Sequence, residues 1–226
     1  NGIHFVDAGV SDGAKGARLG PSIMPGGNRE AYQHVKPIFE AVSAKYQGEP
    51  CVAYLGPKSA GNYVKMVHNG IEYGLMQLLA EAYDVMRRGL GMENAAIQAA
   101  FEDWNSKELR SFLVEITAEI FKAKDNLGKG DLIDVIMDKG KQKGTGKWTS
   151  QEALDLGAAV PTIDLAVIAR VVSAFKTERV AASEILAGPE GLIKKDQKTF
   201  VRRLKNATLF SFIVSYAQGM AMLKDG

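Results

Sequence analysis

The segment from residue 63 to 74 carries polar side chains whose types and spacing suit proton-transfer chemistry. Residues three, four and seven apart share one face of a helix, which places four polar side chains in a single stripe: Lys65, His68, Asn69 and Glu72. Burial of this stripe in a cleft would disfavour the charged forms of the lysine and the glutamate. The stripe therefore predicts a base and an acid that act near neutral pH.

The same spacing also fits a solvated helix face, in which a lysine and a glutamate seven residues apart pair only weakly. Gly70 and Gly74 favour the cleft. Because glycine costs about 1 kcal/mol in a helix interior, two glycines one turn apart indicate close approach of a ligand or of another helix.

A second feature is the basic, glycine-rich segment from Lys139 to Thr149. Its backbone N–H groups, hydroxyl groups and ammonium groups suit a phosphate. The segment fits neither a Walker A motif nor a dinucleotide fingerprint, because Lys147 precedes a tryptophan and Thr149 stands where the last glycine would be. A flexible solvated loop is the alternative. Arg170, midway along an apolar helix, needs an anionic partner, either a carboxylate or a phosphate.

The elements that position these residues begin with a short α/β pattern. Alternation predicts a strand over residues 3–8, which ends in a glycine-rich turn over residues 9–20. Asn28 is a good N-cap for a helix over residues 29–46, and a second strand is expected over residues 51–55. This order is typical of the C-terminal remnant of an α/β sheet domain.

Helical periodicity dominates from residue 59 onward. The expected helices cover residues 60–89, 93–105, 106–122, 132–137, 150–156, 162–186 and 196–223. Ser106 is expected to cap the third of these helices, and Pro161 suits the first turn of the sixth. The predicted fold class is mostly α, with an α/β remnant over residues 1–58 and a large all-α domain over residues 59–226.

Composition limits the function classes. A net charge of +2 on 226 residues gives no field that would attract nucleic acid or an anionic membrane. The single cysteine, Cys51, is expected to be a buried thiol in a reducing cytoplasm. The sequence shows no membrane-length apolar run, no signal peptide and no expected metal site. The abrupt strand-like start and the uncapped last helix suggest truncation at both ends.

Four motifs give the chain a resemblance to the 6-phosphogluconate dehydrogenase family, within the β-hydroxyacid dehydrogenase group. They are Phe5–Ser11, Gly20–Gly27, Lys65–Gly74 and Lys143–Thr149, and the resemblance covers nearly the whole chain. It implies that residues 1–58 are the C-terminal part of a Rossmann-like NADP-binding domain. Residues 59–226 would then be an incomplete all-helical catalytic domain.

The resemblance also implies residue roles. Lys65 would take the hydroxyl proton as general base and later act as an acid, and Glu72 would protonate the enediol carbon. The residues implied to bind substrate are Ser11 and Gly13 at its carboxylate end, His68 and Asn69 along its length, and Tyr73, Lys143, Thr145 and Arg170 at its phosphate. Asn69 would contact the cofactor as well.

The activity implied by the resemblance is oxidative decarboxylation of 6-phosphogluconate to ribulose 5-phosphate with NADP, in the pentose phosphate pathway, by a cytoplasmic homodimer. Two departures stand out. Asp12 replaces a glycine of the family's Ser-Gly-Gly turn. The Gly-x-Gly-x-x-Gly fingerprint is absent, so the sequence does not indicate whether the cofactor is NADP or NAD. The alternatives are another β-hydroxyacid dehydrogenase, or a non-catalytic helical dimerisation or ligand-binding remnant.

Overall fold

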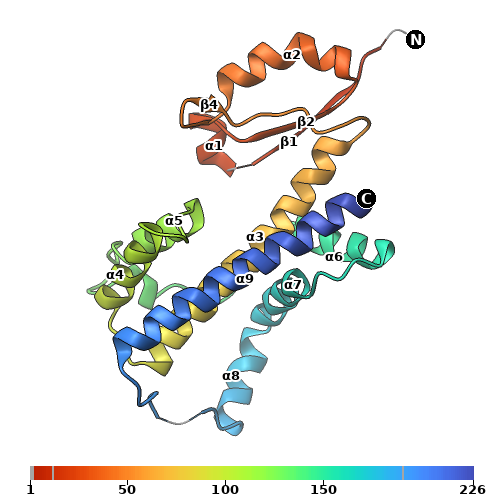
Figure 1. Cartoon of the computed structure of the whole chain (residues 1–226). Coiled ribbons are helices and arrows are strands. Elements are labelled where there is room, and N and C mark those ends of the chain that lie inside the picture. The colour runs from red at the N-terminus through yellow and green to blue at the C-terminus, as the bar shows by residue number, and fades with distance from the viewer. Residues whose placement is uncertain (1–2, 12, 190) are drawn as a thin grey trace.

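The computed structural model describes residues 3–11, 13–189 and 191–226, so Asp12 lies outside the described residues. A small α/β unit sits at one end of a long helix, α3 (Ala60–Asp84), and several helices from later in the chain pack along the rest of α3 (Figure 1). The mostly α architecture predicted from the sequence is confirmed.

The small unit contains two antiparallel strands and two helices. Strand β1 (Val6–Val10) pairs with β2 (Ile23–Gly27), with helix α1 (Gly13–Leu19) between them in sequence and α2 (Arg29–Val42) after them. Strands β3 (Lys45–Tyr46) and β4 (Glu49–Pro50) form a minimal hairpin. The predicted N-cap of α2 is confirmed, because the Asn28 side chain accepts a hydrogen bond from Ala31 N at 2.7 Å.

Several sequence predictions in this unit need correction, and the helix expected over residues 29–46 ends at Val42. The first strand covers residues 6–10 rather than 3–8, and the expected glycine-rich turn contains helix α1. The segment at residues 51–55 forms no full strand. It lies in parallel beside β2 through an isolated bridge at Val52 and hydrogen bonds of Ile23 N to Cys51 O and of Leu55 N to Pro25 O. Cys51 is only partly buried.

The helical part begins with α3, which continues into a π-helical turn, η1 (Val85–Gly89). After it come α4 (Asn94–Asn105), α5 (Phe112–Ile120), the 3₁₀ turn η2 (Leu132–Asp134), α6 (Thr145–Leu156), α7 (Pro161–Ala174), α8 (Lys176–Ile185) and α9 (Gln197–Asp225). Helices α3 and α9 lie side by side and antiparallel, and α6 and α7 also pack on α3 (Figure 1).

Several helix boundaries differ from the sequence predictions. Ser106 ends α4, and the cap of α5 is instead Ser111, whose Oγ accepts from Val114 N. The single helix expected over residues 162–186 is broken at Phe175, whose backbone leaves the helical region. Helix α6 begins at Thr145, five residues earlier than expected, and residues 132–137 contain only one 3₁₀ turn.

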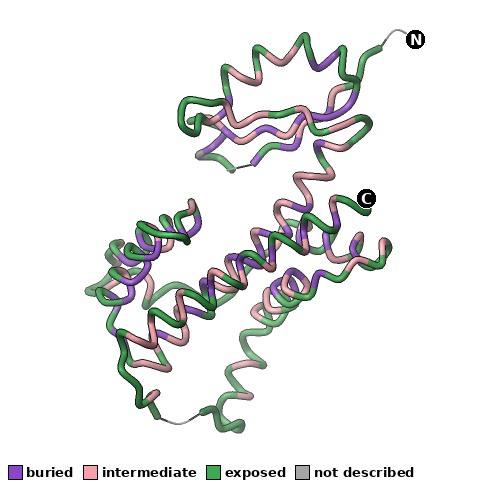
Figure 2. Tube along the Cα trace, viewed as in Figure 1, coloured by how far each residue is buried: buried purple, intermediate pink, exposed green. Residues whose placement is uncertain are grey.

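The core follows the seam between α3 and its neighbours, where buried residues concentrate (Figure 2). Glycines allow close approach at this seam. A Cβ on Gly219 of α9 would lie 2.4 Å from Ile71 Cδ1, and one on Gly70 of α3 would lie 2.5 Å from Thr149 Cγ2. Thr149 of α6 donates from Oγ1 to Met66 O at 2.9 Å. No helix in the described ranges is long and apolar enough to cross a membrane.

A buried carboxylate joins the small unit to α3. Asp7, 5% exposed in β1, accepts from Asn62 N through Oδ2 at 2.7 Å, whereas the N-cap residue Ser59 makes no side-chain capping bond. Glycines on both sides leave room for this contact, because a Cβ on Gly26 would lie 2.3 Å from Asp7 Oδ1 and one on Gly61 would lie 3.0 Å from Oδ2. A carboxylate also suits the positive N-terminal end of a helix. Asp7 thereby caps α3 from another element.

Replacing this cap should destabilise the fold. We expect Asp7→Ala to lower the free energy of unfolding by about 1–2 kcal/mol, the usual cost of losing an N-cap, as measured by urea denaturation followed by circular dichroism. Asp155→Ala is the matched control, because Asp155 is exposed and should change the value by less than about 0.5 kcal/mol. Equal effects of the two variants would show that Asp7 does not cap α3.

The two glycines of the α3 stripe should respond oppositely to alanine. A Cβ on Gly70 would overlap Thr149, so Gly70→Ala should lower the free energy of unfolding by about 1–3 kcal/mol. The nearest atom to a Cβ on Gly74 is Ser215 Oγ at 3.4 Å, so Gly74→Ala should be neutral or gain up to about 1 kcal/mol of helix propensity. The same denaturation assay compares them, and a more harmful Gly74→Ala would refute the packing described for α3.

Candidate active site

The polar stripe of α3 forms a connected hydrogen-bond chain. Lys65 Nζ donates to Asn69 Oδ1 at 2.5 Å, and Asn69 Nδ2 donates to Thr145 Oγ1 at 2.9 Å. His68 Nδ1 lies 3.3 Å from Asn69 Oδ1. Lys65, His68 and Asn69 therefore share one helix face, as predicted, and Asn69 links that face to the first residue of α6.

Glu72 lies at the far end of the stripe. Its Oε2 is 4.0 Å from His68 Nδ1, and the two side chains are 34% and 42% exposed. Lys65 and Asn69 are also of intermediate burial. The stripe is thus an open, half-buried surface in this chain, less enclosed than the cleft expected from the sequence.

Strand β1 passes directly over the beginning of the stripe. A Cβ on Gly9 would lie 2.4 Å from Lys65 Cβ and 2.8 Å from Gly61 O, so only glycine fits at this crossing. Ser11, two residues farther along, is buried and donates from its backbone N to Ser22 O at 3.1 Å. Gly13 starts α1 with a φ of 58°. The structure therefore places the two residues predicted to hold a carboxylate just beyond this crossing.

The basic segment packs against the next turn of α3. A Cβ on Gly146 would lie 2.5 Å from the Tyr73 ring, so this glycine lets the first turn of α6 rest on the aromatic face. Gly144 precedes the helix with a φ of 111°, a backbone conformation that favours glycine. The alternative of a wholly flexible loop is wrong for residues 145–149, which are helical. Lys143 is exposed.

Arg170 reaches this region from α7. Its guanidinium carbon lies 3.9 Å from the centroid of the Tyr73 ring, and its Nη1 donates to Lys141 O at 2.8 Å. Within the described ranges, no carboxylate lies within ion-pair distance of Arg170. The expected anionic partner is thus not supplied by those residues, and a ring and a carbonyl oxygen hold the guanidinium in place.

A cavity of about 370 Å³ adjoins Arg170 and Tyr73, between α3, α7 and the segment before α6. Asp138 lines it, but hydrogen bonds from Arg179 and Lys176 at 2.8 and 2.5 Å hold the pKa of that carboxyl well below its usual range. Asp138 is therefore ionised at neutral pH, with its charge matched by two cations rather than by Arg170.

Sequence reasoning missed the residues that support the site. Ser173 accepts from Gly140 N at 2.9 Å and so anchors the basic segment to α7, and Thr149 locks α6 to α3. In the sequence, Ser173 could have been noticed only as a serine one helical turn after Arg170. Asp7 was visible as a carboxylate within an apolar strand. In the described ranges, no group of three or more His, Cys, Asp or Glu side chains is arranged to hold a metal ion.

Comparison with known proteins assigns the chain to a family. A family model described as the C-terminal domain of 6-phosphogluconate dehydrogenase matches residues 61–226, and one described as the NAD binding domain of 6-phosphogluconate dehydrogenase matches residues 1–56. Two curated relatives are a decarboxylating 6-phosphogluconate dehydrogenase of Lactococcus lactis subsp. lactis, 56% identical, and an NADP(+)-dependent one of Bacillus subtilis, 53% identical. Each covers 99% of this chain, and the chain covers 48% of each.

A solved structure agrees with these matches. The 6-phosphogluconate dehydrogenase of Plasmodium falciparum superposes with a TM-score of 0.92 at 46% identity, over 98% of this chain and 48% of that one. The chain thus spans about half the length of the relatives that it matches. Both the family models and the relatives cover nearly the whole chain, so the chain belongs to the 6-phosphogluconate dehydrogenase family.

Proposed function

We propose that this chain supplies the substrate-binding and acid–base part of an enzyme that oxidises and decarboxylates 6-phosphogluconate to ribulose 5-phosphate with NADP. The observation that carries the proposal is the link from Lys65 through Asn69 to Thr145. It joins a side chain that can accept a proton to a segment suited to a phosphate. The relatives' names, and the Plasmodium enzyme in complex with NADP⁺ and in complex with 6-phosphogluconate, support the same activity.

The first chemical step assigns a base to Lys65. Its neutral amine takes the proton of the substrate hydroxyl while the hydroxyl-bearing carbon gives up a hydride, which the oxidised nicotinamide of a bound cofactor would accept, and a β-keto acid forms. Because Asn69 accepts a hydrogen bond from Lys65 Nζ, the lysine is held on the side of the stripe that faces α6. After the transfer, the ammonium group faces the new carbonyl oxygen.

The second step breaks the carbon–carbon bond to the carboxylate. The bonding pair moves into an enediolate as carbon dioxide leaves, and protonated Lys65 stabilises the negative oxygen and returns its proton there. Glu72 then donates a proton to the enediol carbon while Lys65 takes back the proton of the enediol hydroxyl, which gives the ketose. The two residues are seven positions apart, or about 10 Å along the helix, so they can address neighbouring carbons of one extended substrate.

Tyr73, Lys143, Thr145 and Arg170 are proposed to bind the substrate phosphate. The Tyr73 ring fixes the Arg170 guanidinium, and Thr145 is fixed by Asn69. Lys143 is exposed beside Gly144, where a flexible ammonium group can reach a ligand. A substrate acid without a phosphate would not need these four phosphate-binding residues, which argues against another β-hydroxyacid dehydrogenase.

The carboxylate end of the substrate is assigned to Ser11 and Gly13, with His68 and Asn69 orienting the middle. An open cavity of about 340 Å³ beside His68, lined also by Ser22, Cys51 and Val52, gives a cofactor ring access to the same stripe. The glycine fingerprint that binds a pyrophosphate is not in the 226 residues, so the residues present do not form a complete dinucleotide site. We therefore assign only Asn69 to the cofactor.

The domain division at residue 58, the homodimer and the cytoplasmic location belong to this proposal. The division is supported by the change from strands to helices before α3. Exposed apolar side chains along α9, including Phe210, Ile213 and Met220, support a buried interface in the assembled enzyme.

Substrate binding by the chain itself tests the phosphate site. We expect 6-phosphogluconate to shift backbone amide signals of residues 143–149 in an NMR titration, and gluconate, which lacks the phosphate, to shift them far less. Arg170→Ala or Lys143→Ala should weaken binding by about 10-fold or more, because each removes a charge-assisted hydrogen bond. Lys147→Ala, in the same segment but not assigned to the site, should stay within about twofold. Equal losses for all three would contradict the assignment.

A chimera tests the chemistry. The 226 residues replace their counterpart in the Lactococcus lactis relative, and cofactor reduction by 6-phosphogluconate is followed by absorbance. Lys65→Met and Glu72→Gln should each lower kcat by about 10²–10⁴-fold, whereas Glu81→Gln on the same helix should leave it within about twofold.

Glu72→Gln should also change the stereochemistry of the product. In deuterated water the unaltered chimera should add deuterium to one face of the product carbon, and Glu72→Gln should give a mixture, because the enediol is then protonated in solution. An unaltered chimera that binds 6-phosphogluconate without turning it over, or full turnover with both substitutions, would refute the proposed roles.

A further inference from the structure

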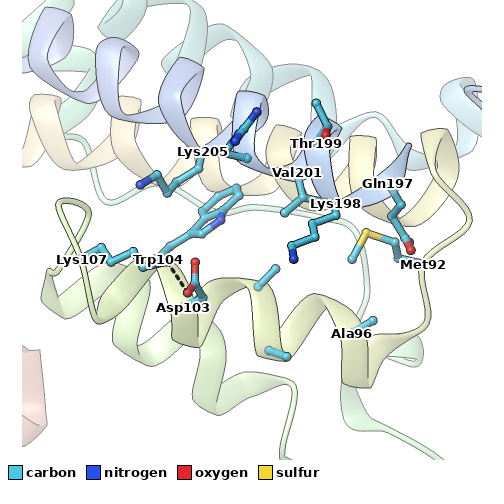
Figure 3. A pocket seen from close by; sticks show the side chains of 13 residues that line it. Met92, Ala96, Asp103, Trp104, Lys107, Gln197, Lys198, Thr199, Val201 and Lys205 are labelled. Atoms are coloured by element: carbon cyan, nitrogen blue, oxygen red, sulfur yellow. Dashed lines mark hydrogen bonds and ion pairs between the residues drawn. The ribbon is translucent and has the colours of Figure 1, made fainter. Parts of the chain in front are cut away.

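A third open cavity, of about 710 Å³, lies between α4 and the first turns of α9 (Figure 3). We call it the α4–α9 groove. Its lining residues are Met92, Ala96, Ala99, Ala100, Asp103, Trp104 and Lys107 before α9, and Gln197, Lys198, Thr199, Val201, Arg202 and Lys205 at the start of α9. Its volume lies in the range of small-molecule sites, roughly 300–1,000 Å³.

The groove is separate from the candidate active site. Helix α9 meets the polar stretch of α3 near Gly219, which faces Ile71, whereas the groove ends at Lys205. The intervening 14 residues of helix span about 21 Å. A ligand in the groove therefore touches none of the residues assigned to 6-phosphogluconate.

The α9 side of the groove carries three cations, Lys198, Arg202 and Lys205. The lining holds four cations and one carboxylate, Asp103, which pairs with Lys107 at 2.5 Å. Lys205 pairs with Glu108 at 2.6 Å, and its side chain is only 12% exposed. Lys198 and Arg202, one turn apart on the same face of α9, have no ion pair among the residues that the structure describes. Two cations thus remain to meet a ligand.

The N-terminus of α9, beside the groove, is already capped by a carboxylate. Asp196 caps the helix by accepting from Thr199 N at 2.8 Å, so that backbone donor is already used. Asp196 interacts with Lys198 and Arg202 only electrostatically, as a minor contribution to its lowered pKa behind the hydrogen bonds from Thr199. Recognition in the groove must therefore come from the side chains of Lys198 and Arg202.

The other side of the groove is apolar and made of small residues. Ala96, Ala99 and Ala100 lie three and four positions apart, so they share the face of α4 that borders the groove. Trp104, almost fully buried, extends from α4 toward Val201 and Lys205 of α9 and lines the groove between the two helices (Figure 3). Because alanine side chains do not reach across to α9, the hollow remains between the two helices.

We propose that the α4–α9 groove binds an organic dianion with a compact apolar body, with its charged head on Lys198 and Arg202 and its body against the alanine face of α4. Two cations without ion pairs match two negative charges, and the alanine face matches an apolar body of about one ring. This site is independent of the proposed dehydrogenase activity.

Phenyl phosphate is the probe for this site. Trp104 and Trp148 are the two tryptophans of the chain, and Trp148 stands beside the proposed substrate phosphate site. Trp148→Phe therefore leaves Trp104 as the reporter of the groove. We expect a saturable change in Trp104 fluorescence, with a Kd on the order of 1 mM for so small a ligand, and the same Kd by calorimetry. Inorganic phosphate and phenol should each bind at least about fivefold more weakly, because each makes half of the contacts.

Charge reversal locates the site. In the Trp148→Phe background, Arg202→Glu should weaken phenyl phosphate binding about 10-fold or more. Arg203→Glu is the matched control, since Arg203 has the same charge and is adjacent but does not line the groove, and it should change Kd less than about twofold. Ala99→Leu should weaken phenyl phosphate and leave inorganic phosphate unchanged.

Three results would overturn the proposal. They are equal losses for Arg202→Glu and Arg203→Glu, equal binding of phenol and phenyl phosphate, or no saturation by either method. Loss of binding in Lys143→Ala without loss in Arg202→Glu would assign the probe to the candidate active site instead. Helical circular dichroism verifies that each variant is folded.

Discussion

The contact between Asp7 and the N-terminus of α3 is the interaction on which the geometry of the candidate site depends. It fixes where β1 crosses α3, and that crossing sets the position of Ser11 relative to Lys65. A carboxylate in an apolar strand is costly to bury. The backbone N–H of Asn62 and the positive end of the helix offset part of this cost, and glycines at positions 26 and 61 allow the approach.

Helix α3 then serves as the common support of the remaining parts. One face packs on α9 through Gly219, a second packs on α6 through Gly70, and the polar stripe lies beside α6. Since each neighbour approaches through a position without a side chain, the helices are closely spaced and their relative heights are fixed. Contacts with α3 therefore fix the positions of β1, Thr145 and Arg170 relative to one another, although these residues are far apart in the sequence.

The sequence predicted the features that depend on local chemistry. The helical second half, the Asn28 cap and the shared face of Lys65 and Asn69 follow from periodicity and capping preference, and all three are confirmed. Roles within the site came from family resemblance and remain proposals.

Features that depend on distant partners were not predictable in this way. Asp7 bonds to a residue 55 positions away, and Arg170 finds the Tyr73 ring rather than an anion. The break at Phe175 also escaped prediction, since residues 162–186 read as one periodic helix. Asp138, far earlier in the chain, holds Lys176 and Arg179 just after that break. Pairings of this kind arise from packing, and no single segment encodes them.

The side-chain amide of Asn69 limits which residues can take its place. Its oxygen accepts a hydrogen bond from Lys65, and its nitrogen donates a hydrogen bond to Thr145. Aspartate offers no donor, leucine offers neither group, and glutamine carries both one methylene too far from the backbone. Each of these three substitutions would therefore break the link between Lys65 and the phosphate-suited segment.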